Sequence, residues 1–166
     1  MRSPHSPARA AQPDGGSARV HRPRVLVAED DREMRRLVVE ALTADGCDVA
    51  EVCDGVELLA QVGSSVLFGG FGSTREPPDL IVTDVRMPGL TGLTVVEGLR
   101  RAGVAVPVVV ITAFGDDETH RVALEHGAVA VFDKPFDLDD LRTIVQHALR
   151  AGSGVAAPSD DPGGSS

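Results

Sequence analysis

Short apolar runs alternate along the middle of this chain with segments in which apolar residues recur every three or four positions. Uninterrupted apolar runs are typical of strands buried on both faces of a sheet, and the three-to-four spacing is typical of helices with one buried face. The two patterns alternate between residues 23 and 151. This alternation predicts a parallel sheet with helices on both sides, a doubly wound three-layer α/β sandwich.

The expected strands cover residues 25–28, 48–53, 80–84, 106–111 and 128–132. The first helix carries an apolar stripe that includes Leu37 and Val38 and should end at Asp45-Gly46. The other helices are expected at residues 54–62, around Leu93 to Leu99, at 116–125 and at 137–150. Carboxylates at the start of the last helix, Asp137 to Asp140, are interpreted as a helix N-terminal charge cluster rather than as a second metal site.

Three segments lack such periodicity. Residues 1–22 and 152–166 are rich in Gly, Ser, Pro and Ala, and we expect both to be disordered tails of a single domain at 23–151. Residues 63–78 contain a Gly-Gly-Phe-Gly sequence and two prolines, so we interpret them as a long mobile insertion in a loop. In the alternative interpretation, Phe68 and Phe71 form a flap that docks a partner.

Composition excludes several classes of function. The net charge of −9 and the 3% aromatic content disfavour nucleic acid as a direct partner, because phosphates need a basic surface and bases need stacking platforms. No apolar run approaches the ~20 residues of a membrane span, and no signal peptide is evident, so we expect a cytoplasmic protein without membrane partners. Cys47 and Cys53 are interpreted as two small buried thiols rather than a disulfide.

Polar residues stand where the expected strands end. Glu29 and Asp30 follow the first strand, Asp84 ends the third, Thr112 follows the fourth and Lys134 follows the fifth. The carboxyl ends of parallel strands meet at one edge of a sheet, where ligands of such folds bind. We therefore expect three carboxylates, a hydroxyl and an ammonium to converge there.

This set of groups suits phosphoryl transfer onto an aspartate. Clustered carboxylates repel one another unless a cation neutralises them, and Mg²⁺ takes carboxylate and phosphate oxygens as ligands. A carboxylate can attack phosphorus, while Lys134 and Thr112 stabilise the charge on the transferred group. Lys134 is the only lysine beside 15 arginines, which points to a need for a compact ammonium. The alternatives without a chemical role are that Glu29 to Asp31 only cap a helix and that Lys134 is an ordinary surface residue.

Four motifs in this order resemble the response-regulator receiver domains of two-component signalling, of the free-standing chemotaxis-like type. They are Val25-Leu26-Val27-Ala28-Glu29-Asp30-Asp31, Thr83-Asp84-Val85-Arg86-Met87-Pro88-Gly89, Ile111-Thr112-Ala113 and Asp133-Lys134-Pro135-Phe136. The resemblance covers about residues 24–150 and implies a five-stranded sheet in the flavodoxin-like order 2-1-3-4-5.

The resemblance also implies roles. Asp84 is expected to be the phosphoacceptor, with Thr112 as the switch hydroxyl and Lys134 as the residue that grips a phosphoryl oxygen. Mg²⁺ is expected on Glu29, Asp30, Asp84 and the backbone carbonyl of Arg86. The donor is expected to be a phosphohistidine of a sensor kinase or histidine phosphotransfer protein, and the output is expected to be phosphorylation-dependent contact with another protein. Such a domain is a phosphoprotein carrying a 4-aspartylphosphate, and we do not expect an enzyme beyond its own phosphorylation and dephosphorylation.

The chain departs from the family at some positions. Val131 stands where the family often has Tyr or Phe, and Phe132 should point to the opposite side of the sheet. Arg86 and Phe114 occupy positions at which the family tunes the lifetime of the phosphoryl group. The remaining histidines of the expected helices, His120, His126 and His147, are expected to be exposed or at the edge of the core.

Two other classes of function fit the sequence less well. A pseudo-receiver that docks partners without taking phosphate is disfavoured by the intact set of Asp84, Thr112 and Lys134. An aspartate-nucleophile phosphatase would need a second Asp at position 86, where Arg stands. A flavodoxin-like flavoprotein would need a phosphate-binding loop after the first strand, where acidic residues stand instead.

Overall fold

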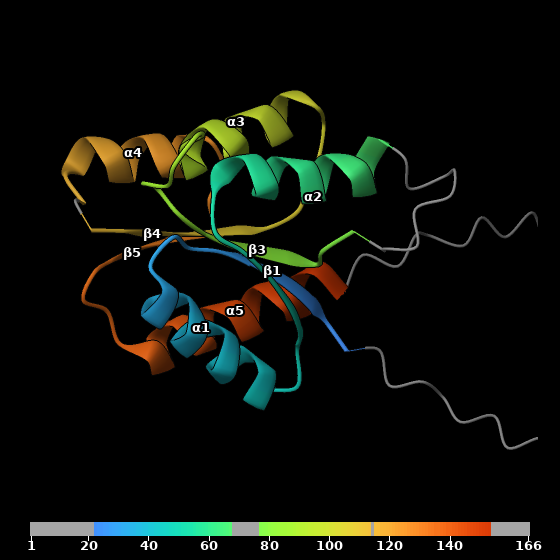
Figure 1. Cartoon of the computed structure of the whole chain (residues 1–166), viewed down its shortest axis with the longest axis vertical. Helices are drawn as coiled ribbons and strands as arrows, with labels where there is room; N and C mark the ends of the chain where they lie inside the picture. The colour runs from blue at the N-terminus through green and yellow to red at the C-terminus, as the bar shows by residue number, and fades with distance from the viewer. Residues whose placement is uncertain (1–21, 68–76, 114, 154–166) are drawn as a thin grey trace, which may run out of the picture.

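A five-stranded parallel sheet forms the centre of the protein in the computed structural model, which describes residues 22–67, 77–113 and 115–153 (Figure 1). The strand order is β2-β1-β3-β4-β5, so the expected flavodoxin-like order is confirmed. The strands are β1 (Arg24–Ala28), β2 (Asp48–Val52), β3 (Leu80–Asp84), β4 (Val108–Thr112) and β5 (Ala130–Asp133).

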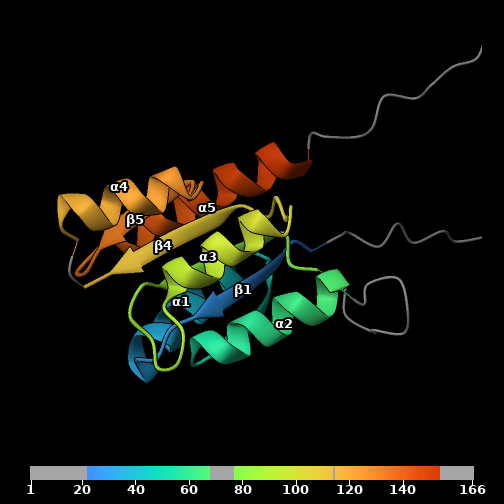
Figure 2. The ribbon, with the colours of Figure 1, turned by 90° about the horizontal axis from the view of Figure 1, so that it is seen from above.

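Helices cover both faces of the sheet and complete the expected three layers (Figures 1 and 2). One face carries α2, α3 and α4, and the opposite face carries α1 and α5. The helices are α1 (Arg32–Ala44), α2 (Gly55–Leu67), α3 (Gly92–Arg101), α4 (Asp117–Glu125) and α5 (Leu138–Ser153).

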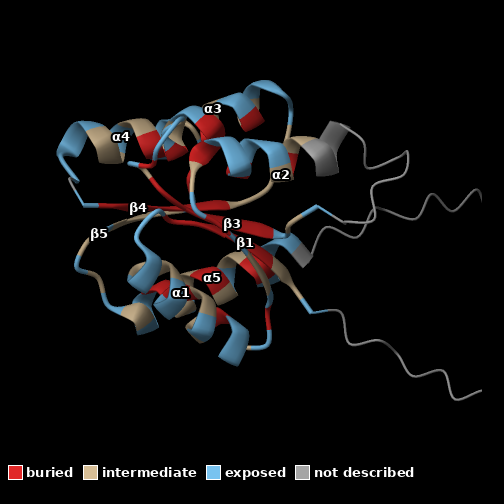
Figure 3. Ribbon diagram, viewed as in Figure 1, coloured by how far each residue is buried: buried red, intermediate tan, exposed pale blue. Residues whose placement is uncertain are grey.

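Each face of the sheet has its own apolar core, and the buried residues line the strands and the inner sides of the helices (Figure 3). β3 and β4 are buried along their whole length, as their unbroken apolar runs predict for central strands. Alternation along β5 puts Val131 in the core under α2, α3 and α4, whereas Phe132 packs in the core under α1 and α5. The expected opposite orientation of Val131 and Phe132 is confirmed.

Several expected boundaries were wrong. β4 begins at Val108, two residues late, and Pro107 contributes only its carbonyl, which accepts from the Ile81 N–H at 3.0 Å. α2 continues to Leu67, so residues 63–67 belong to a helix and not to the expected insertion at 63–78. α5 continues to Ser153, two residues into the expected C-terminal tail at 152–166. The expected flap residues Phe68 and Phe71, and the rest of both expected tails except Arg22, lie outside the described residues.

Two side-chain expectations were also wrong. Leu37, expected on the buried stripe of α1, is 52% exposed, because the buried face of this helix is centred on Val38 and Leu42. Both cysteines were expected to be buried, but only Cys47 is buried and Cys53 is exposed. Both are free thiols, as expected.

Among the described residues, no helix is both long and apolar enough to cross a membrane.

Candidate functional site at the carboxyl edge of the sheet

Side chains from three separate parts of the chain meet at the carboxyl edge of the sheet. Glu29 follows β1, Asp84 ends β3 and Lys134 follows β5. Lys134 Nζ donates to Asp84 Oδ2 at 2.7 Å and to Glu29 Oε1 at 3.0 Å, and it lies 2.8 Å from Glu29 Oε2. One ammonium therefore bridges two carboxylates that belong to neighbouring strands.

These three groups are removed from solvent to different extents. The side chains of Glu29 and Asp84 are 2% and 5% exposed, and that of Lys134 is 17% exposed. Burial raises the pKa of Glu29 to about 7, and the nearby Asp84 adds to the rise, while the hydrogen bond from Lys134 opposes it. Burial also disfavours the charged form of Lys134, but its hydrogen bonds to Asp84 and Glu29 outweigh that cost, so the pKa of Lys134 is raised.

Asp30 and Asp31 stand beside Glu29 but have different surroundings. Asp31 is the N-cap of α1, and its Oδ1 accepts the Met34 N–H at 2.7 Å. Asp30 is exposed, and one of its carboxylate oxygens lies within 4.8 Å of oxygens from Glu29 and Asp84. Asp31 is thus engaged in capping a helix, whereas Asp30 faces the site.

Arg35 supports the acidic residues from α1, a role that the sequence did not suggest. Its guanidinium donates to the Glu29 carbonyl at 2.7 Å and lies 3.4 Å from a carboxylate oxygen of Glu51 on β2. The contact holds the backbone at the end of β1 against the first helix. The sequence has several arginines at the start of this helix and does not indicate which of them contacts the end of β1, because that depends on the fold.

The backbone around Asp84 is closely packed. Its Oδ1 accepts the Arg86 N–H at 3.0 Å, so the following turn fixes one carboxylate oxygen. A Cβ added to Gly92 would lie 2.1 Å from the Asp84 carbonyl oxygen, and the Gly92 N–H donates to the Val85 carbonyl at 3.0 Å. α3 can therefore begin directly under Asp84 only because position 92 has no side chain.

The other expected site residues lie nearby with less defined roles. Thr112 ends β4, is 1% exposed, and pairs in register with Asp133 on β5. Its carbonyl accepts the Lys134 N–H at 2.7 Å, so Thr112 and Lys134 share a backbone contact at the sheet edge. The peptide bond from Lys134 to Pro135 is cis. Phe114 lies outside the described residues.

The three carboxylates fit a divalent cation. Glu29, Asp30 and Asp84 carry three negative charges when ionised, against one positive charge on Lys134. Glu29 Oε2 is buried and receives no aligned hydrogen bond from the described residues, despite its ion pair with Lys134. Mg²⁺ prefers hard oxygen ligands, and here the buried Glu29 carboxylate lies close to the carboxylates of Asp30 and Asp84.

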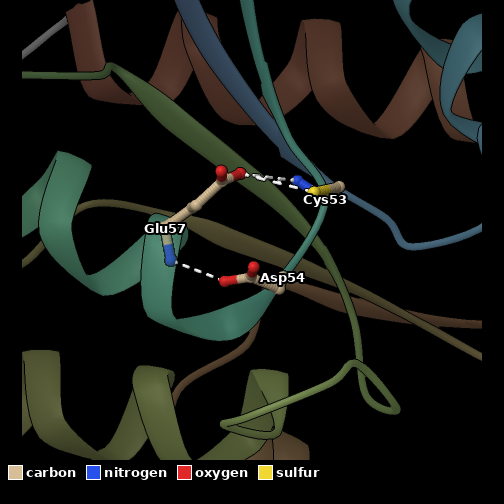
Figure 4. Close-up of side chains that lie close together, drawn as sticks. All are labelled: Cys53, Asp54 and Glu57. Atoms are coloured by element: carbon tan, nitrogen blue, oxygen red, sulfur yellow. Dashed lines mark hydrogen bonds between the residues drawn. The ribbon is translucent and has the colours of Figure 1, made fainter.

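A second group with metal-ligand atoms, Cys53, Asp54 and Glu57, has a different explanation (Figure 4). Asp54 Oδ1 accepts the Glu57 N–H at 2.7 Å, and Glu57 Oε2 accepts the Cys53 N–H at 3.1 Å. These two bonds form a cap at the start of α2, as the sequence Asp-Gly-Val-Glu predicts, although Glu57 reaches back to the N–H of Cys53 and not to that of Asp54. One oxygen of each carboxylate, Asp54 Oδ1 and Glu57 Oε2, therefore accepts a backbone N–H.

Comparison with known proteins agrees with this geometry. A family model described as the response regulator receiver domain matches residues 25–146. The chain is 38% identical over 128 residues to the response regulator MprA of Mycobacterium leprae, covering 76% of this chain and 51% of that protein. It is 27% identical to sporulation initiation phosphotransferase F of Bacillus subtilis, covering 76% of this chain and 93% of that protein. The chain thus spans about half the length of the MprA relatives and nearly all of the second protein.

Solved structures show the same architecture. The receiver domain of the Francisella response regulator 1452 superposes with a TM-score of 0.65 at 27% identity, covering 78% of this chain and 98% of that one. The chemotaxis response regulator CheY4 of Vibrio cholerae superposes with a TM-score of 0.65 at 25% identity, covering 77% and 99%.

Proposed function

This chain belongs to the response regulator receiver domain family, and we propose that it accepts a phosphoryl group on Asp84. The observation that carries the proposal is the contact of Lys134 with both Asp84 and Glu29 at the carboxyl edge of the sheet. The Asp84 carboxylate, which is nearly buried, thus lies beside the Lys134 ammonium and the acidic residues Glu29 and Asp30. In the part of the chain that the structure describes, no other carboxylate at that edge ends a fully buried central strand.

In the proposed reaction, an Asp84 carboxylate oxygen attacks the phosphorus of a phosphohistidine. An O–P bond forms, the N–P bond breaks, and the imidazole leaves with its electron pair and takes up a proton. The product is an acyl phosphate on Asp84. Lys134, already 2.7 Å from Asp84, is placed to exchange its carboxylate contact for one with a phosphoryl oxygen.

We further propose Mg²⁺ as the cofactor, held by Glu29, Asp30 and Asp84 together with the Arg86 carbonyl. When bound, it would neutralise charge on the phosphoryl oxygens. The crowding of acidic groups around one lysine supports a cation here. The hydrogen bond from the Arg86 N–H to Asp84 supports the turn that would bring the Arg86 carbonyl to the site.

The donor that fits is a phosphohistidine of a sensor kinase or of a histidine phosphotransfer protein, since the family works in two-component systems. We propose that the phosphorylated protein signals by contact with another protein. The net charge of −9 supports a protein partner rather than nucleic acid. A cytoplasmic location is consistent with such donors.

Phosphorylation with acetyl phosphate and Mg²⁺ tests the assignment. Mass spectrometry should show one added phosphoryl group on the wild type, lost on treatment with hydroxylamine because acyl phosphates react with it. Asp84→Asn should take none. Asp79→Asn is the matched control, because Asp79 lies just before the same strand but at its opposite end from the site. There its carboxylate accepts the Arg24 N–H at 2.7 Å. Equal labelling of Asp84→Asn and the wild type would show that Asp84 is not the acceptor.

A further inference from the structure

The start of α2 lies directly against the turn between β3 and α3, residues 85–91, which we call the β3–α3 turn. α2 and α3 lie side by side on the same face of the sheet (Figures 1 and 2). A Cβ added to Gly55, the first residue of α2, would lie 2.0 Å from the Leu90 carbonyl oxygen and 2.7 Å from the Leu90 carbonyl carbon. The two backbones can approach this closely only because position 55 has no side chain.

Further contacts hold the β3–α3 turn on α2. The Gly55 N–H donates a long hydrogen bond to the Pro88 carbonyl, at 3.4 Å. Met87 is buried in the apolar core that also contains Leu58 and Val62 of α2. Backbone and side-chain contacts together therefore set the position of the turn relative to this helix.

The start of α2 is itself held in place by its cap (Figure 4). Asp54 Oδ1 accepts the Glu57 N–H at 2.7 Å, and Glu57 Oε2 accepts the Cys53 N–H at 3.1 Å, directly after β2. The carbonyl of Val52, the last residue of β2, accepts the Glu29 N–H at 3.2 Å. The cap thus joins the first turn of α2 to the end of the strand that lies beside Glu29.

The other end of the β3–α3 turn is tied to the proposed phosphorylation site. The Arg86 N–H donates to Asp84 Oδ1 at 3.0 Å, and the Val85 N–H donates to the Ile111 carbonyl of β4 at 2.9 Å. The Arg86 carbonyl, a proposed ligand of Mg²⁺, belongs to the backbone between this end and Leu90. A displacement imposed at Leu90 therefore has to be taken up by the short segment that contains this carbonyl.

We propose that Gly55 is a positioning residue for the cation site. By letting α2 pack on the β3–α3 turn, it fixes the Arg86 carbonyl relative to Asp84, although it supplies no ligand atom itself. Residues that hold a metal ligand from outside the site commonly change metal affinity when they are replaced. The inference rests on the proposed Mg²⁺ site for its effect on cation affinity, whereas the packing of α2 on the turn does not depend on it.

Calorimetric titration with Mg²⁺ tests the proposal. Gly55→Ala should force the turn away from α2 and weaken Mg²⁺ binding about tenfold, as expected when the support of a metal ligand is disturbed. Gly63→Ala in the same helix is the matched control and should keep wild-type affinity. Apart from its chain neighbours and the backbone of α2 itself, no atom of the described residues lies within 4 Å of a Cβ at that position.

Val145→Ala controls for a general loss of stability. Val145 is buried in the core on the opposite face of the sheet, so its truncation should destabilise the fold but leave Mg²⁺ affinity unchanged. Wild-type affinity in a folded Gly55→Ala would overturn the inference. An equal loss of affinity in either control would overturn it as well.

A second pair of variants decides the question if Gly55→Ala does not fold. Asp54→Ala and Asp54→Asn remove the same negative charge, but only asparagine can still accept the Glu57 N–H and cap α2. Asp54→Ala should therefore bind Mg²⁺ about two- to fivefold more weakly than Asp54→Asn, the effect of losing a helix cap. Equal affinities would then refute the positioning role.

If the wild type bound no Mg²⁺, the proposed cofactor would fail, and amide hydrogen exchange in the metal-free protein would decide whether Gly55 positions the turn. The relevant amide is that of Arg86, which donates to Asp84. Faster exchange of this amide in Gly55→Ala than in Gly63→Ala would support the positioning of the turn, and equal exchange would refute it. The two Asp54 variants allow the same comparison if Gly55→Ala does not fold.

Discussion

Lys134 Nζ lies 2.7 Å from Asp84 Oδ2 although the two residues are 50 positions apart in the chain. The side chains come from the ends of β3 and β5, with β4 between them. A lysine has to reach across the end of β4 to make this contact, and its long stem allows the charged end to do so.

Lys134→Arg should slow phosphorylation of Asp84 by acetyl phosphate by about five- to 150-fold, the effect of losing ~1–3 kcal/mol from a charged hydrogen bond. The planar guanidinium keeps the charge but cannot place one compact donor between Glu29 and Asp84. The initial rate of labelling measures this. Arg121→Lys, an exchange on the exposed side of α4, serves as the control, and equal rates for Lys134→Arg and wild type would mean that the ammonium is not required.

Asp30→Asn should weaken Mg²⁺ binding by about tenfold or more, because it removes one of the three proposed carboxylate ligands. Isothermal titration calorimetry suits the measurement, since the chain has no Trp or Tyr for fluorescence. Asp31→Asn is the neighbouring control. Asn caps a helix as well as Asp does, so the hydrogen bond to Met34 should survive and Mg²⁺ affinity should change little. The opposite order of effects would show that Asp31, and not Asp30, faces the metal.

Gly92→Ala should destabilise the fold by about 1–3 kcal/mol, because the new Cβ would meet the Asp84 carbonyl oxygen. Gly98→Ala in the same helix is its control. Apart from its chain neighbours and the backbone of α3 itself, no atom of the described residues lies within 4 Å of a Cβ there, so alanine should stabilise α3 by up to about 1 kcal/mol. Urea unfolding of the two variants should therefore shift in opposite directions from the wild type. Stabilisation by both substitutions would show that α3 can move away from Asp84.

The Asp45–Arg142 pair predicts a pH dependence of stability. Arg142 donates to both carboxylate oxygens of Asp45 at the end of α1, and these bonds lower the pKa of Asp45 below its usual value of 3.8. A carboxylate with a lowered pKa stabilises the fold above its unfolded pKa, and this contribution is lost as the pH falls through the folded pKa. Asp45→Asn should therefore lower the thermal unfolding midpoint at pH 7, and the difference from wild type should shrink below about pH 4. A difference that is the same at pH 7 and pH 3 would contradict the ionic origin of the effect.

Hydrophobic patterning was enough to predict the layered α/β fold, because unbroken apolar runs require burial on both faces of a strand and three-to-four spacing requires burial of one face of a helix. It also predicted which residues end the strands, since Glu29, Asp84 and Lys134 each follow a run that has to be buried. The cap roles of Asp31 and Asp54 follow equally from local rules, because each accepts an N–H three residues further along the chain.

The long-range partners of individual side chains depend on the tertiary structure and could not be predicted from the sequence. Nothing in the sequence distinguishes Arg35, which turns back to the Glu29 carbonyl, from the arginines beside it. Nor does the spacing between His120 and Asp133 indicate that their side chains form a hydrogen bond, because their distance depends on how α4 packs on the sheet. The exposure of Leu37 and Cys53 follows from the same cause. Local patterns tell which residues can be buried or charged, but the angle at which a helix lies on the sheet determines what each side chain meets.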